Sequence, residues 1–217
     1  MPSMITAVRH GQSESNAAFD RAEATGAAIV LPGSDRDVSL SPLGRKQATE
    51  LGRRLATGET PEAVWCSPYR RAVQTWELVA AELDVVPEFR LEARLGDREM
   101  GALSGMNLAA IRERFPEQAE GLISRRYSHR APEGESIPDV ADRVREVLAD
   151  LHAECADRRV LVIAHDAVVL MVKHVLEGIP LASLDAFIPV HNASISIWRG
   201  ARPEVFNDAG HLGNVTF

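Results

Sequence analysis

The 217-residue chain has 45 % hydrophobic and 25 % charged residues, a composition typical of a globular protein with one large core. Its formal net charge of −7 argues against a nucleic-acid or acidic-membrane partner, because both are polyanionic. No stretch approaches the roughly 18 uncharged apolar residues that a membrane span needs, and the first residues lack a signal-peptide pattern. We therefore expect a single cytoplasmic domain spanning residues 1–217.

Three short apolar runs, at residues 4–8, 63–66 and 160–164, predict buried strands. Each run leads into polar residues and then into a helix-like segment. Residues 194–198 alternate like a further strand, and residues 205–217 look like a looser hairpin or tail. The repeated strand–helix order predicts an α/β fold, a three-layer α/β/α sandwich with a mostly parallel mixed central sheet.

Capping signals predict where three helices begin. Ser41-Pro42 precedes a helix reaching about residue 56, and Ser67-Pro68 precedes one reaching about residue 83. Ser136 with Asp139 forms a capping-box pattern before an amphipathic helix. The apolar face of that helix is marked by Val140, Val144, Leu148, Leu151 and Cys155.

Two long segments do not fit a regular strand–helix unit. Residues 19–37 contain glycine and proline among small residues, which favours an irregular excursion. Residues 99–135 are too long for a turn and contain helix-like pieces around Ile111 and Gln118. We expect both segments to be inserted covers over a site.

The candidate site lies where the predicted strands end. His10 and His165 follow the first and third apolar runs, and Ser67 and Arg71 follow the second. Ligands of parallel α/β sheets bind beyond the carboxyl ends of the strands, so these side chains are expected at one edge. Together with Arg9 they would form a cationic pocket, which favours a bound dianion such as a phosphoryl group.

The ordered motifs resemble those of the histidine phosphatase superfamily, in its phosphoglycerate-mutase-like branch, over nearly the whole chain. The blocks that carry the resemblance are Arg9-His10-Gly11 with Ser13-Glu14 and Asn16, Ser67 with Arg71 and Gln74-Thr75, Asp97 to Gly105, Gly134-Glu135-Ser136, His165, and Asn192-Ala193-Ser194. By this resemblance His10 attacks phosphorus and carries a phosphohistidine intermediate. Arg9, Asn16 and Arg71 would bind the phosphoryl oxygens, and His165 would donate to the same oxygens.

The resemblance leaves the proton donor open between two acids. The family places a carboxylic acid four residues before the glycine that corresponds to Gly101, and Asp97 occupies that position instead of the usual glutamate. Glu99 is the rival. Either acid needs a raised pKa to carry its proton near neutrality.

The remaining positions bear on the substrate. Arg98, Arg125 and Arg126 resemble the substrate arginines of cofactor-dependent phosphoglycerate mutases, whereas Met100 and Leu108 replace residues that those mutases carry. The resemblance thus favours a phosphoric monoester hydrolase of the histidine acid phosphatase type, with no metal or other cofactor and with water as the acceptor. Its substrate would be a small phosphorylated metabolite, and the chain could form a homo-oligomer. A cofactor-dependent phosphoglycerate mutase and a non-catalytic phosphate-binding or scaffold protein are the alternatives.

Overall fold

A mixed six-stranded sheet forms the centre of the computed structural model, which describes residues 1–213. The strands are β1 (Met4–Arg9), β2 (Ala63–Cys66), β3 (Glu88–Leu91), β4 (Arg159–Ala164), β5 (Ile195–Arg199) and β6 (Arg202–Asp208). Their order is β3-β2-β4-β1-β5-β6; the first four strands are parallel, β5 is antiparallel to β1, and β6 is antiparallel to β5. The predicted mostly parallel α/β fold is confirmed. Strand β3 was not predicted, and residues 214–217 of the predicted tail lie outside the described residues.

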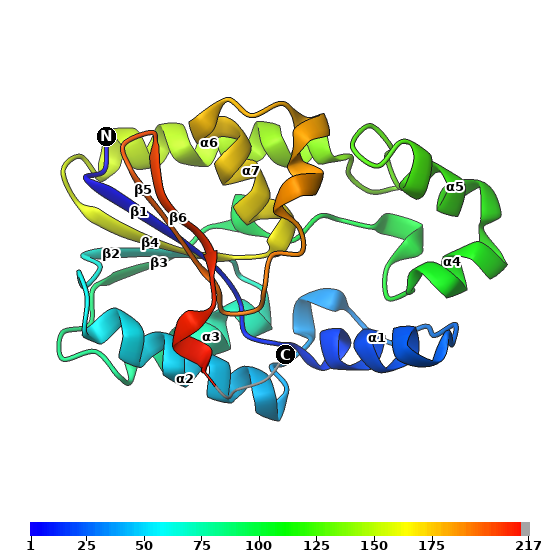
Figure 1. The fold of residues 1–217 in the computed structure, drawn as a ribbon, viewed down its shortest axis with the longest axis horizontal. Helices are drawn as coiled ribbons and strands as arrows, with labels where there is room; N and C mark the ends of the chain where they lie inside the picture. The colour runs from blue at the N-terminus through cyan, green and yellow to red at the C-terminus, as the bar shows by residue number, and fades with distance from the viewer. Residues whose placement is uncertain (214–217) are drawn as a thin grey trace.

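Helices cover both faces of the sheet (Figure 1). On one side lie α6 (Ile137–Glu154) and α7 (Asp166–Glu177), and on the other α2 (Pro42–Ala56) and α3 (Arg70–Ala80). Because strand side chains alternate, Val160 and Val162 of β4 join the core under α6 and α7, and Leu161 and Ile163 join the core under α2 and α3. The sheet is therefore buried on both faces.

Two of the three predicted helix starts are confirmed. The Ser41 side chain accepts from the backbone N–H of Gly44 at the start of α2, and Ser136 forms a capping box with Asp139 at the start of α6. The predicted start at Ser67-Pro68 is wrong, because α3 begins at Arg70 without a side-chain cap. The Ser67 hydroxyl is instead engaged with the His165 ring, 2.9 Å from its Nε2 atom.

The first cover segment is more regular than predicted. Residues 14–25 form α1 (Glu14–Thr25), so the predicted irregular excursion is wrong for residues 19–25. The helix forms because Ser13 and Asn16 make a reciprocal capping box, and Gly26 ends it in the left-handed conformation. The remainder is irregular apart from the short helix η1 (Asp35–Asp37).

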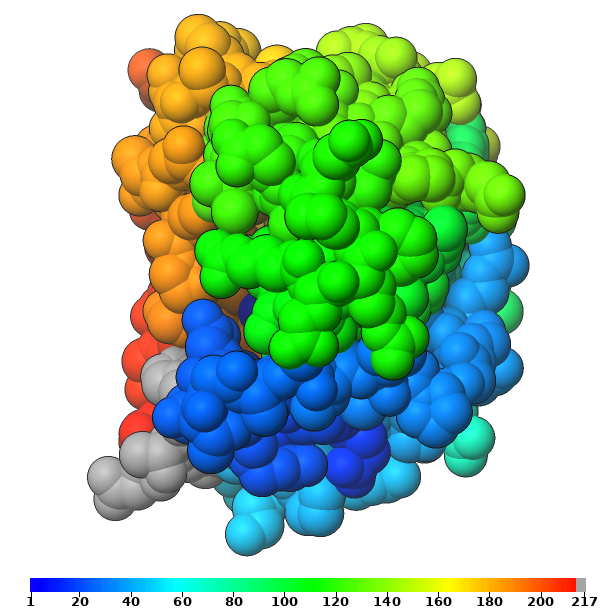
Figure 2. All heavy atoms as spheres, turned by 90° about the vertical axis from the view of Figure 1, so that its right-hand side faces the viewer, coloured from blue at the N-terminus to red at the C-terminus, as the bar shows by residue number. Residues whose placement is uncertain are grey.

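The second cover segment contains the predicted helical pieces, α4 (Leu108–Arg114) and α5 (Pro116–Ser124). They pack around their own small cluster of Leu103, Ile111, Ala119 and Ala131. In Figure 1 they lie beyond the carboxyl ends of the parallel strands, on the same side as α1. Figure 2 views this side directly and shows the green second cover meeting the blue first cover.

Short 3₁₀ helices complete the described chain, at η2 (Ala93–Leu95), η3 (Gly101–Leu103), η4 (Leu181–Phe187) and η5 (Gly210–Leu212). Within residues 1–213, no helix is long and apolar enough to cross a membrane.

Candidate active site

His10 follows β1 directly and is almost completely buried, with 2 % of its surface exposed. Its Nδ1 atom lies 2.7 Å from the carbonyl oxygen of Gly11. A carbonyl oxygen only accepts hydrogen bonds, so Nδ1 carries the ring hydrogen and Nε2 holds the lone pair. The Nε–H of Arg71 donates to that Nε2 atom over 3.1 Å. The ring is thus held in the tautomer that presents a nucleophilic nitrogen to the pocket.

The surroundings of His10 keep its imidazole neutral. Burial lowers its pKa well below the ordinary value of 6.5, and the charges of Arg71, His165 and Arg9 lower it further. Only a neutral imidazole has a lone pair to donate. His10 therefore remains competent as a nucleophile at neutral and mildly acidic pH.

His165 directly follows β4, as the N-cap residue of α7, and faces His10, with the two ring centroids 5.0 Å apart. The backbone N–H of Tyr69 donates to the Ser67 hydroxyl, and that hydroxyl can donate in turn to Nε2 of His165. The other ring nitrogen of His165, Nδ1, lies 3.3 Å from Oδ2 of Asp97. The two predicted strand-end histidines thus meet, as their place at the carboxyl ends of parallel strands implied.

Arg71, in the first turn of α3, connects the histidine to two carboxylates. Its Nη2 atom donates to Oδ2 of Asp97 and to Oδ2 of Asp35, each over 2.9 Å. Its Nη1 atom donates to the backbone oxygen of Asp35 over 2.6 Å. Asp35 was missed at the level of sequence, because it lies in an irregular segment without a motif.

Asp97 lies inside the cluster of cationic and imidazole groups. Its Oδ1 atom accepts from the backbone N–H of Arg98 over 2.8 Å. Burial raises the pKa of Asp97, but the neighbouring His165 and Arg71 outweigh burial and hold that pKa well below its ordinary range. Asp97 is therefore ionised when no other anion occupies the site.

Arg9 and Asn16 border the same pocket. The Nη1 atom of Arg9 donates to the backbone oxygen of Val190 over 2.6 Å, whereas its buried Nε atom has no hydrogen-bond partner within the described part of the chain. The Asn16 side chain accepts from the amide of Asn192, which also donates to the backbone oxygen of His10 over 3.0 Å. The Nη2 atom of Arg9, 3.9 Å from Oδ2 of Asp166, is left as the donor for a ligand, and Asn192 fixes the turn that carries His10.

The other predicted site residues lie farther from His10 or are already engaged. Glu99 is exposed and pairs with Arg36, 3.1 Å away. Arg98 borders the pocket, but its guanidinium donates to the backbone oxygens of Glu135 and His129. Arg126 lies at the exposed rim, 3.4 Å from Asp185. Arg125 does not line the pocket.

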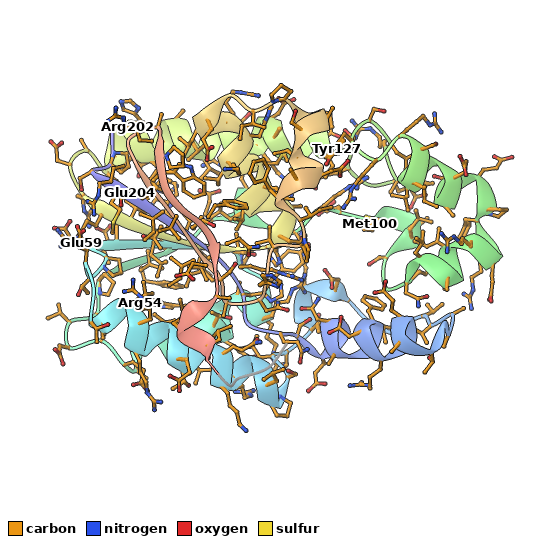
Figure 3. The ribbon with its side chains drawn as sticks, in the orientation of Figure 1. Arg54, Glu59, Met100, Tyr127, Arg202 and Glu204 are labelled. Carbon is orange, nitrogen blue, oxygen red and sulfur yellow. The ribbon has the colours of Figure 1, made fainter. Side chains whose placement is uncertain are left out.

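A pocket of about 930 Å³ opens beside these groups. Both cover segments line it, together with α7 and the loop at residues 188–190. Met100 and Tyr127, labelled in Figure 3, belong to its lining. Among residues 1–213, no three histidine, cysteine or acidic side chains are grouped as ligands for a metal ion. The arginines and histidines at the inner end can bind a phosphoryl group through their own donors.

The model of the histidine phosphatase superfamily (branch 1) matches residues 5–205. The chain belongs to the histidine phosphatase superfamily. Its curated relatives include a 2,3-bisphosphoglycerate-dependent phosphoglycerate mutase of Rhizobium etli, 32 % identical over 187 residues, which cover 82 % of each chain. A metal-independent phosphoserine phosphatase of Arabidopsis thaliana is 30 % identical over 76 % of this chain and 64 % of its own length. The superfamily resemblance predicted from the motifs is thereby confirmed.

A further relative is longer than this chain. A 6-phosphofructo-2-kinase/fructose-2,6-bisphosphatase of Caenorhabditis elegans is 31 % identical over 88 % of this chain, which spans only 38 % of that protein. Among solved structures, a putative alpha-ribazole-5'-P phosphatase of Escherichia coli shares the fold with a TM-score of 0.79 and 20 % identity, over 96 % of this chain and 97 % of its own. A mycobacterial glucosyl-3-phosphoglycerate phosphatase has a TM-score of 0.74 and 25 % identity, over 95 % of this chain and 99 % of its own.

Proposed function

We propose that this chain is a metal-independent phosphatase, which hydrolyses a small phosphomonoester through a phosphohistidine intermediate on His10. One observation carries the proposal: the lone pair on Nε2 of His10 is held at the end of a pocket, against the Nε–H of Arg71. The lone pair becomes free to attack phosphorus when the Nε–H of Arg71 donates instead to an oxygen of the bound phosphoryl group.

In the first step, Nε2 of His10 forms a bond to phosphorus while the bond from phosphorus to the leaving oxygen breaks. Arg9, Arg71 and His165 bind the phosphoryl oxygens, and Asn16 adds a neutral donor. The leaving oxygen takes a proton from Asp97. In the second step, a water oxygen attacks phosphorus, the phosphorus–nitrogen bond breaks, and the proton of the water returns to Asp97.

Asp97 is preferred to Glu99 as the proton donor because of its position. Oδ2 of Asp97 lies within 3.3 Å of both Arg71 and His165, whereas Glu99 pairs with Arg36 at the surface. The negative charge of a bound phosphoryl group competes for the same cations and raises the pKa of Asp97. The acid and the phosphoryl group then share one proton.

A phosphoglycerate mutase is the second candidate, because mutases such as the Rhizobium etli protein match most of the chain. Two of the predicted substrate arginines favour the phosphatase. The guanidinium of Arg98 donates to backbone oxygens, and Arg125 does not line the pocket. The proposed substrate is a phosphorylated metabolite, in a cytoplasmic setting that fits the acidic net charge of −7.

Rapid quenching after mixing with a ³²P-labelled phosphomonoester tests the proposal. We expect acid-labile labelled protein in the wild type, none in His10→Ala, and unchanged labelling in His152→Ala, which removes an exposed histidine of α6. Unchanged turnover in His10→Ala would overturn the proposal. Isomerisation of 3-phosphoglycerate that depends on 2,3-bisphosphoglycerate would favour the mutase, and phosphate binding without turnover would favour a non-catalytic protein.

A further inference from the structure

Apolar side chains line much of the pocket beyond the phosphoryl end, alongside serines and charged residues. They come from four parts of the chain: Phe19 of α1, Met100 and Met106 of the second cover, Leu170 of α7, and Ile188 with Pro189 of the following loop. Phe19 and Ile188 lie outside the three hydrophobic clusters that form the core of the described residues. Their apolar surface is therefore available to a ligand.

The size of the pocket exceeds what a phosphoryl group alone needs. At about 930 Å³ it lies near the upper end of the range for small-molecule sites, roughly 300–1,000 Å³. A leaving group of only two or three carbons would leave most of the apolar wall in contact with water. The dimensions fit a substrate whose leaving group is much larger than its phosphate.

The charged side chains around this part of the pocket are already paired. Arg36 lies 3.1 Å from Glu99, and Arg126 lies 3.4 Å from Asp185. The guanidinium of Arg98 donates to two backbone oxygens, and its burial lowers its pKa. Within the part of the chain that the structure describes, each arginine of the lining outside the phosphoryl end thus has a partner for which a second anionic group would have to compete.

The carboxylates in the lining are paired in the same way. Asp35, Glu99 and Asp166 border the pocket and lie 2.9, 3.1 and 3.9 Å from the guanidinium groups of Arg71, Arg36 and Arg9. A charged group on the substrate would have to compete with these ion pairs, whereas an uncharged apolar group would contact the apolar side chains directly.

We infer that the substrate is a phosphomonoester with a bulky, uncharged and mainly apolar leaving group, which packs between α1, α7 and the second cover. The inference rests on the proposed phosphatase function and deepens it. Burial of apolar surface stabilises the complex in proportion to the area removed from water, so the affinity should follow the length of the apolar group.

A series of n-alkyl phosphates from ethyl to octyl, measured below their micelle concentrations, tests the inference. The longer alcohols differ little as leaving groups, so the series varies chiefly in apolar surface. We expect kcat/KM to rise about threefold to fourfold per added methylene until the pocket is filled. Hexyl phosphate that carries a terminal carboxylate should be turned over more slowly than hexyl phosphate.

Substitutions of apolar residues that line the pocket identify where the alkyl group of the substrate binds. In Phe19→Ala and Leu170→Ala, the ratio of kcat/KM for octyl phosphate to that for ethyl phosphate should fall at least threefold. It should stay unchanged in Ile123→Ala, which truncates an exposed residue of α5 outside the lining.

The outcomes separate this inference from the proposed function. If phosphate is released but kcat/KM stays constant or falls as the alkyl group lengthens, the inference is overturned and the proposed phosphatase function stands. Faster turnover of the carboxylated ester would have the same meaning. Absence of both phosphate release and phosphoenzyme with every ester would overturn the proposed function, and the inference with it.

Discussion

The side chain of Arg71 links the candidate nucleophile to two acids. Its Nε atom lies 3.1 Å from Nε2 of His10, and its Nη2 atom lies 2.9 Å from a carboxylate oxygen of both Asp35 and Asp97. The two carboxylates occupy donors that a phosphoryl group would use. A bound substrate must therefore replace at least part of these contacts.

Removing the charge of Arg71 should raise the pKa of His10. Burial is the largest cause of its lowered pKa and Arg71 is the second, so Arg71→Met leaves the imidazole more easily protonated. The pKa should move upward from a value below 6.5, as measured by NMR titration of ¹⁵N-labelled histidine. Arg70→Met, which changes the exposed neighbour, is the control. A His10 pKa that stays in place in Arg71→Met would contradict the assigned environment.

Replacing Asp97 should remove most of the turnover of esters with poor leaving groups. General acid catalysis contributes typically 10²- to 10⁴-fold, so kcat of Asp97→Asn for an alkyl phosphate should fall by about that factor. The loss should be much smaller for p-nitrophenyl phosphate, whose leaving group needs little protonation. Glu99→Gln is the matched control and should retain nearly full kcat with both esters. The reverse pattern would assign the proton to Glu99.

Much of this site could be predicted because buried parallel strands leave a clear signal. The apolar runs before His10 and His165 identified β1 and β4. Because the carboxyl ends of parallel strands lie at one edge of the sheet, both histidines were expected close together. The caps at Ser41 and Ser136 could also be predicted, because each one satisfies backbone N–H groups in the first turn of its own helix and so depends only on neighbouring residues.

The features that the sequence did not predict depend on contacts between distant segments. Strand β3 has four residues that are mostly exposed, so it has no apolar run, and its pairing with β2 defines it. The contact of Asp35 with Arg71 joins residues 36 positions apart. Ser67 looked like a helix cap, but the proximity of the His165 ring determines what its hydroxyl contacts.

Adding a methyl group at Gly44 should destabilise the protein and the site together. Alanine is normally favoured over glycine within a helix by about 1 kcal/mol, but a Cβ on Gly44 would overlap the backbone of Gln12, two residues after His10. We expect Gly44→Ala to lower the free energy of unfolding by about 1–3 kcal/mol, as overpacked positions do, and to lower kcat. Urea denaturation measures the first effect. Lys46→Ala, at an exposed position of the same helix, should change stability by less than about 0.5 kcal/mol.

Neutralising Asp35 should strengthen the binding of inorganic phosphate. The Asp35 carboxylate pairs with Arg71 and stands close to the anion site, so its charge both occupies a donor and repels a dianion. Asp35→Asn keeps an oxygen acceptor for Arg71 but removes the charge. We expect the inhibition constant of phosphate to fall about threefold to fivefold, the size typical of a partly exposed ion pair.

Asp37→Asn is the matched control, because it removes an exposed acid from the same short helix η1. Competitive inhibition by phosphate at several salt concentrations gives the measurement, and the gain should shrink as salt screens the charge. Weaker phosphate binding in Asp35→Asn would mean that Asp35 holds the Arg71 guanidinium in place for the substrate. An equal gain in Asp37→Asn would assign the effect to the net charge of the protein.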